Sequence, residues 1–228
     1  MIPVQLPPEP QDFNFRVRQP GLAALRNVGH NPNNPPPNER FWKTPHQTAA
    51  GGTRNTLDYW TIARDDLCNG YNRRCVYSCF VIEPVRDGSG RVVGGDHSID
   101  HFDPKSLHPA KEAFEWTNLR WCWNVINNKK GDSSIAIDAV SMPGTIVELE
   151  EDVKGDWIVV PAKSINFFST AQVQDTIDKL GLNTVRPVVI RRNGYVKDFV
   201  DNIDGYSDAE MFVRQPFIFS ELRRLGRI

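Results

Sequence analysis

The amino-acid sequence predicts an α+β protein with a small β-containing core, a proline-rich N-terminal arm and a C-terminal helical region. Apolar, β-branched runs separated by turn residues lie in the middle of the chain, and patterns of helical period fill most of its last third. Hydrophobic residues make up 39% of the 228, which suffices for a buried core. We therefore divide the chain into an extended arm at 1–56, a core at 57–135 and a β-hairpin with helices at 136–228.

The arm is defined by its prolines, ten of which lie between Pro3 and Pro45. Proline lacks a backbone donor and fixes its own backbone angle, so the segment 30–37 cannot form a regular helix or a central strand. Apolar residues such as Phe13, Phe15 and Trp42 are too frequent for a solvated tail. We expect an extended arm that packs along its own domain or onto a partner.

The core region combines one hairpin signal with several helical patterns. The turn residues Asp87-Gly88-Ser89-Gly90 join two strand-like runs at 76–85 and 92–102. The other predicted core elements are a helix at 56–66, a short helix at 110–115, an extended segment at 118–123 and a helix at 124–130. Gly131 would end the last helix.

The C-terminal region begins with two predicted strands at 144–150 and 156–161, joined by a turn. An amphipathic helix at 170–180 follows and would end at Gly181. We expect the segments 185–200 and 208–225 to be helical, with breaks at Gly194, Gly205 and Pro216.

Charge and the N-terminal sequence limit the possible functions. The net charge is −1, so a nucleic-acid partner would have to meet a local basic patch or be held with the help of another subunit. The opening MIPVQLPPEP contains no basic segment followed by an apolar one, and no secretory signal is predicted. We expect a cytoplasmic protein whose four cysteines are reduced.

Three polar stretches in the core carry the chemistry. The first contains Asp100 and His101 followed by Pro104-Lys105-Ser106, the second is Trp116-Thr117-Asn118-Leu119, and the third is Asn127-Asn128-Lys129-Lys130-Gly131. Histidine titrates near neutral pH and suits a general base. Mg²⁺ needs only one or two oxygen ligands from protein and can stabilise the leaving oxygen of a phosphodiester.

In this order, the three stretches resemble the landmarks of the HNH, or ββα-metal, endonuclease family, over residues 72–132. The run Cys75-Val76-Tyr77-Ser78-Cys79 is similar to a branch that includes HNH subunits accompanying ATPases in bacterial anti-phage defence, such as the Septu type. The resemblance implies a ββα-metal HNH core, a nucleic-acid substrate that we expect to be DNA, and an ATPase as a partner subunit.

The resemblance also implies roles for individual residues. Asp100 and Asn127 would hold one Mg²⁺ or Mn²⁺, with the adjacent Asn128 as the alternative to Asn127. His101 would be the general base, and Asn118 would hold a loop that orients His101. On strand alternation alone, Asp100 and His101 should point to opposite sides of the chain.

A local basic cluster accompanies these residues and consists of Lys105, Arg120, Lys129 and Lys130. Beside the motif we expect these side chains to contact nucleic-acid phosphates. The alternative is a solvated helix end, where cations are favoured by the helix dipole.

The cysteines leave a second kind of site open. Many relatives of the family bind a structural zinc, which here would require Cys75, Cys79 and Cys122 with one further ligand. The spacing departs from the usual zinc motifs, so buried thiols are the favoured interpretation. Two other functions stay open: an HNH-like subunit that mainly binds an ATPase, and a structural zinc protein.

Overall fold

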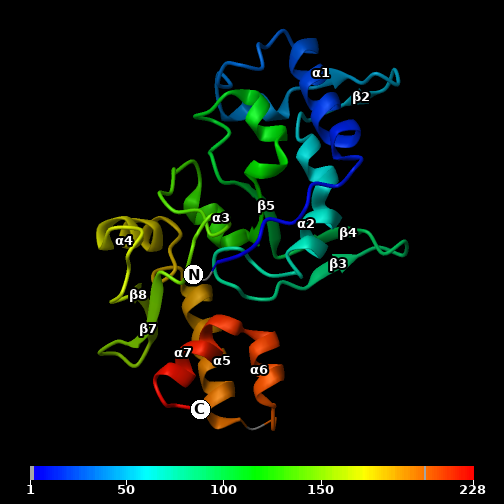
Figure 1. Ribbon diagram of the computed structural model, residues 1–228. Coiled ribbons are helices and arrows are strands. Elements are labelled where there is room, and N and C mark those ends of the chain that lie inside the picture. The colour runs from blue at the N-terminus through cyan, green and yellow to red at the C-terminus, as the bar shows by residue number, and fades with distance from the viewer. Residues whose placement is uncertain (1–2, 203) are drawn as a thin grey trace.

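The computed structural model describes residues 3–202 and 204–228. In this part of the chain, helices are combined with four separate antiparallel sheets of two strands each (Figure 1). The prediction of an α+β protein is therefore confirmed at this level.

The arm packs on its own chain, but it is not extended throughout. The backbone N–H of Val4 donates to the carbonyl of Ala139 (2.9 Å), and Trp116 Nε1 donates to the carbonyl of Pro7 (2.7 Å). Its regular elements are η1 (Asn14–Arg18), α1 (Gln19–Asn27), η2 (Glu39–Lys43), β1 (His46–Gln47) and β2 (Thr53–Arg54). The sequence prediction of an extended arm did not include α1, whose Pro20 lies in the first turn, where no hydrogen bond is lost.

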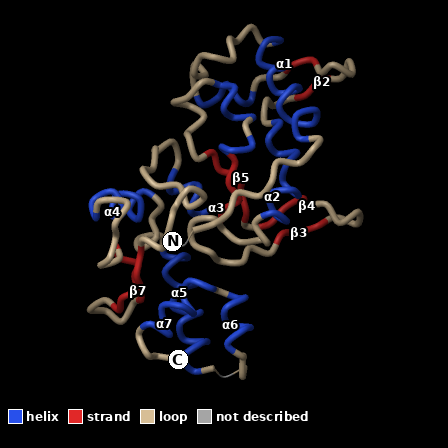
Figure 2. The backbone as a smooth tube through the Cα atoms, viewed as in Figure 1, coloured by secondary structure: helices blue, strands red, loops and turns tan. Residues whose placement is uncertain are grey.

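The core region contains short elements linked by long loops (Figure 2). They are η3 (Tyr59–Ala63), α2 (Arg64–Gly70), β3 (Pro84–Arg86), β4 (Val92–Gly95), β5 (His97–His101), η4 (Ala110–Phe114), η5 (Trp116–Asn118), β6 (Leu119–Trp123) and α3 (Asn124–Lys130). The predicted helix at 56–66 lies a few residues later in the chain, as η3 and α2. The predicted helix at 110–115 is the 3₁₀ helix η4.

Most of the segment predicted as a strand at 76–85 is a tight loop instead. Cys79 has a left-handed backbone (φ 62°), and its N–H donates to the carbonyl of Cys75 (2.8 Å), so the chain turns back on itself. Only β3, at the end of this segment, pairs with β4. The predicted strand at 92–102 is also divided, because Gly95, the last residue of β4, adopts φ 118°.

A hairpin followed by a helix forms the centre of the molecule. β5 pairs antiparallel with β6, with Asp100 opposite Arg120 and His101 opposite Leu119. α3 follows β6 directly and packs against both strands. Gly131 ends α3 with a positive φ of 53°, as its sequence position predicted.

The C-terminal region follows the sequence prediction closely. Its elements are β7 (Val147–Glu151), β8 (Trp157–Pro161), α4 (Thr170–Lys179), α5 (Arg186–Asp201), α6 (Asp208–Arg214) and α7 (Pro216–Arg224). β7 and β8 pair antiparallel across a turn at Gly155, and Gly181 follows α4 with φ 63°. The break expected at Gly194 is wrong, because α5 continues through it.

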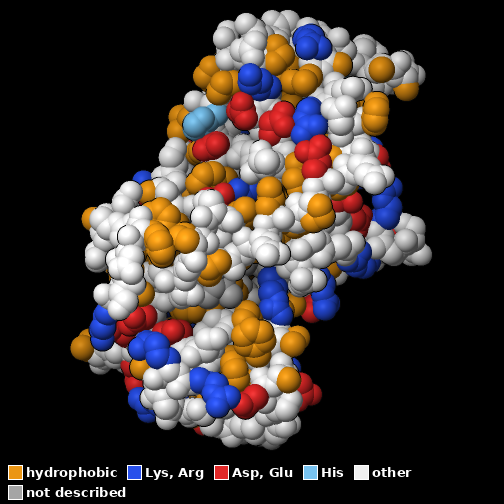
Figure 3. All heavy atoms as spheres, in the orientation of Figure 1, with side chains coloured by type: hydrophobic (Ala, Val, Ile, Leu, Met, Phe, Trp, Pro, Cys, Tyr) orange, Lys and Arg blue, Asp and Glu red, His pale blue; other side chains and the backbone are white. Residues whose placement is uncertain are grey.

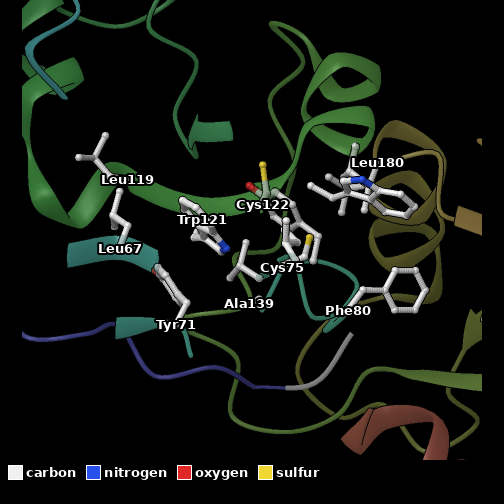
Figure 4. Packing of buried hydrophobic residues seen from close by; sticks show 14 of the residues in the cluster. Leu67, Tyr71, Cys75, Phe80, Leu119, Trp121, Cys122, Ala139 and Leu180 are labelled. Carbon is white, nitrogen blue, oxygen red and sulfur yellow. The ribbon is translucent and has the colours of Figure 1, made fainter. Parts of the chain in front are cut away.

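One apolar cluster connects the arm, the core and the C-terminal region. Figure 4 shows part of it around Trp121, where side chains from α2, β6 and α4 come together. Within the described residues, no helix is both long enough and apolar enough to span a membrane.

Candidate functional site

The β5–β6 hairpin sends Asp100 and His101 to different environments, as strand alternation predicted. Asp100 contacts Tyr77 and Lys130, whereas His101 packs against Trp60 and the carbonyl of Ala113. Both side chains are almost fully covered, with exposed fractions of 3% and 4%. The two residues therefore need separate accounts.

Asp100 is held by two donors from outside its own hairpin. The hydroxyl of Tyr77 donates to Oδ2, and Lys130 Nζ donates to Oδ1 at 3.0 Å and to the His101 carbonyl at 2.7 Å. Burial raises the pKa of Asp100, while Lys130 and Tyr77 act in the opposite direction. A buried carboxylate with a lysine partner is thus a stable feature of this hairpin.

His101 is neutral in this environment, because burial lowers its pKa to about 3. Its Nε2 lies 3.1 Å from the carbonyl oxygen of Ala113. A carbonyl can only accept, so Nε2 must carry the proton and donate it, which leaves the lone pair on Nδ1. The ring is also fixed edge-on to Trp60, with 4.8 Å between the ring centroids. The nitrogen able to accept a proton is therefore Nδ1.

Asn118 organises the loop that supplies this carbonyl. Its Oδ1 accepts from the backbone N–H of Asp103 (2.7 Å), and its Nδ2 donates to the carbonyls of Asp103 and Glu112 (both 3.1 Å). Glu112 immediately precedes Ala113, whose carbonyl holds His101. Asn118 thus closes both ends of the 103–112 loop and positions His101 through it.

Asn127 lies on the same helical face as Lys130, one turn earlier in α3. Since Lys130 contacts Asp100, this placement brings Asn127 to the Asp100 side of the hairpin. Asn127 is half-buried and its side chain has no hydrogen-bond partner among the described residues, whereas Asn128 is exposed. Of the two candidate ligands, Asn127 is the better placed.

A surface cleft of about 310 Å³ lies beside this region. It is lined by Glu39, Trp42, Lys105, Ser106, Gly131 and Asp132. Trp42 packs edge-on against Trp60, which in turn contacts His101. His101 therefore lies beneath the cleft, separated from it by aromatic side chains.

The predicted basic cluster is only partly available to phosphates. Arg120 is 2% exposed and forms an ion pair with Asp138, and Lys130 is 1% exposed and pairs with Asp100. The predicted phosphate contact does not hold for these two residues in this structure, because both cations are buried and already neutralised. Lys105 is half-buried at the cleft, and Lys129 is exposed.

The cysteines proposed as zinc ligands lie in the apolar interior. Cys75, Cys79 and Cys122 are each at most 3% exposed, and Figure 4 shows Cys75 and Cys122 beside Trp121. Burial raises the pKa of Cys122, whose sulfur lies 3.4 Å from Ser98 Oγ. The described residues do not bring three His, Cys, Asp or Glu side chains together into a group that would hold a metal ion.

Sequence reasoning missed the partners that fix the predicted residues. Tyr77, Ala113 and Asp138 are distant in sequence from the residues they contact, and no local pattern pairs them. Only Tyr77 carried a signal, because it is the central residue of the Cys-x-Tyr-x-Cys run.

Comparison of the chain with protein-family models, with curated proteins and with solved structures gave no match.

Proposed function

We propose that this protein is a metal-dependent endonuclease of the HNH type, with β5, β6 and α3 as its ββα-metal core. The observation that carries the proposal is the arrangement of four side chains on this unit. Asp100 contacts Lys130 of α3, and Asn127 lies one turn before Lys130 in the same helix. Asn118 holds the loop whose carbonyl orients His101. The four residues were chosen from the sequence motif, and these contacts support the proposal without testing it.

In the proposed reaction, His101 removes a proton from the water that attacks phosphorus. Its proton-accepting atom is Nδ1, because Nε2–H is committed to the carbonyl of Ala113. Asn118 is a positioning residue that maintains this tautomer by fixing the loop. The products are a 5′-phosphate and a 3′-hydroxyl.

In this proposal, Asp100 and Asn127 would hold one hard divalent cation. Each carboxylate oxygen of Asp100 accepts one hydrogen bond and retains a second lone pair, and Asn127 offers an amide oxygen. One carboxylate and one amide match the few protein ligands that Mg²⁺ or Mn²⁺ takes in addition to water. When bound, the cation supplies charge stabilisation at the phosphate and at the leaving oxygen.

Asp100 and His101 are almost fully covered by other parts of the chain. His101 is 4% exposed, so little of its ring is open to water in this conformation. The partnership with an ATPase and the role in anti-phage defence rest on the sequence resemblance alone and stay predictions.

Cleavage assays with purified protein test the proposal. Plasmid DNA and a single-stranded RNA are incubated with wild type, His101→Ala and His97→Ala, each with Mg²⁺, Mn²⁺ or EDTA. His97 is the matched control, because it lies on the same strand and stacks on Trp121 (4.3 Å) away from Asp100. Wild type and His97→Ala should cut with metal only and leave 5′-phosphate ends, whereas His101→Ala should not cut.

Cleavage by a correctly folded His101→Ala protein at the wild-type rate would overturn the assignment. If one substrate is cut and the other is not, the result identifies DNA or RNA as the substrate. Circular dichroism of each variant shows whether a loss of cutting follows from unfolding.

A further inference from the structure

A groove of about 330 Å³ lies between the loop after α2 and the helices α5 and α6. It is lined by four arginines, Arg73, Arg74, Arg191 and Arg214, and also by Asn72, Val81, Glu83, Tyr195 and Val213. Figure 3 shows Lys and Arg side chains near the notch in the surface above the C-terminal helices. In a chain of net charge −1, this is a local concentration of positive charge.

Three of the four guanidinium groups form no ion pair among the described residues. Arg74 donates to the carbonyl of Val213, and Arg191 donates to the carbonyl of Val81. Arg214 donates to the hydroxyl of Tyr206 (2.7 Å). These contacts fix the side chains without neutralising them.

Arg73 is the exception, since it pairs with Glu83 at 2.8 Å, and both side chains of this pair are at least half exposed. Surface pairs of this kind contribute little stability and exchange readily for another anion. Glu83 is the one acid that lines the groove, so the groove keeps an excess of positive charge.

The backbone at the groove is held in an uncommon conformation. Asn72 and Arg73 are consecutive residues with left-handed φ angles of 50° and 60°. Such a conformation is costly for a long side chain and persists where surrounding contacts enforce it, often at binding sites. Here the contacts are Arg73 N–H to the carbonyl of Cys68 (2.7 Å) and Ile82 N–H to the carbonyl of Arg73 (2.7 Å).

The loop that carries Arg73 and Arg74 also carries Tyr77, whose hydroxyl donates to Asp100. Gln215, between α6 and α7, donates from Nε2 to the carbonyl of Ser78 (3.1 Å). One side of this loop therefore faces the groove, while another residue of the same loop supports the candidate catalytic carboxylate.

We infer that this groove binds the phosphodiester backbone of a nucleic acid and holds it outside the catalytic site. Arginine suits this role, because its planar fork donates two hydrogen bonds to phosphate and stays charged. The choice of nucleic acid over another polyanion rests on the proposed nuclease activity. The groove replaces the buried Arg120 and Lys130 as the source of phosphate affinity.

Binding without cleavage tests this inference. Fluorescence anisotropy with labelled duplex DNA, single-stranded DNA and RNA is measured in EDTA over a series of salt concentrations. The groove variant is Arg73→Gln/Arg214→Gln, in which both replaced side chains are exposed. The matched control is Arg223→Gln/Arg227→Gln, which removes the same charge from two exposed arginines outside the groove.

The groove variant should bind roughly tenfold more weakly than the control, and the slope of log affinity against log salt should fall by about 1 to 2. Equal affinities of the two variants, or no binding by wild type, would overturn the inference. Displacement of the nucleic acid by inorganic phosphate at a concentration equal to that of the nucleic acid would also overturn the inference, because the groove would then be a small-anion site. Because no metal is present, loss of cutting in His101→Ala does not affect this result, and the two proposals fail separately.

Discussion

The candidate catalytic site and the arginine groove handle charge in opposite ways. Asp100 and Arg120 are both buried and paired, with Lys130 and Asp138 as their counter-ions. In the groove, Arg74, Arg191 and Arg214 are held by neutral oxygens and keep their charge available. In the proposed function, affinity for a polyanion and chemistry on it would therefore be located in different parts of one molecule.

The largest effect on stability should come from breaking the buried pair at Asp100. Lys130→Met leaves a buried carboxylate without its counter-charge, and we expect a loss of about 3–5 kcal/mol in the free energy of unfolding. Urea unfolding measures this change. If Asp100 binds a divalent cation, Mg²⁺ or Mn²⁺ should recover part of the loss.

Asp138→Asn is the control for the metal effect. It also removes the partner of a buried charge, Arg120, so it should destabilise by a similar amount. Metal should not recover that loss, because the substitution removes the carboxylate of Asp138 and leaves Asp100 paired with Lys130. Equal metal responses in Lys130→Met and Asp138→Asn would contradict a cation site at Asp100.

A second, smaller effect should follow from Asn118→Ala. The substitution leaves the N–H and carbonyl of Asp103 and the carbonyl of Glu112 without their partner, and we expect a loss of about 2–3 kcal/mol. Cleavage should fall as well, because the Ala113 carbonyl no longer fixes His101. Asn118→Asp keeps the acceptor for the Asp103 N–H but turns a second carboxylate oxygen toward the carbonyls of Asp103 and Glu112, so it should destabilise at least as much as Asn118→Ala in urea unfolding. An Asn118→Ala protein as stable as wild type would refute the loop role.

The smallest effect on stability should come from a substitution in α5, outside the candidate catalytic site. Gly194 lies within α5, and a Cβ added there meets nothing within 4 Å. Gly194→Ala should therefore stabilise the protein by about 0.5–1 kcal/mol through helix propensity. Thermal unfolding measures the shift. Destabilisation by Gly194→Ala would contradict the expectation that alanine favours the helical conformation at this position.

Where the sequence predicted the fold well, a single local signal was sufficient. α3 ends at Gly131, α4 ends before Gly181 and the β7–β8 turn contains Gly155, each with the positive φ that glycine allows. α4 also begins with a capping box between Ser169 and Gln172, a purely local device. These features depend on residues a few positions apart, which a sequence pattern can record.

Where prediction failed, distant contacts decided the conformation. Residues 76–82 are as apolar as a strand, yet the left-handed Cys79 turns them into a loop that is buried from several sides. Likewise, Asp100, His101, Asn118 and Asn127 were proposed from the motif and stay predictions, whereas the pairing of Arg120 with Asp138 could not be read from the sequence. Whether a cation is buried depends on its tertiary partners. The sequence alone therefore could not separate the basic residues that form buried ion pairs from those that stay available to a phosphate.

The central claim is that His101 performs the chemical step. Single-turnover cleavage with protein in excess, using His101→Ala and wild type with Mg²⁺, measures that step separately from binding. We predict that the rate falls by at least about 10²-fold while nucleic-acid affinity in EDTA stays at the wild-type value. An unchanged single-turnover rate in a folded His101→Ala protein would contradict the account.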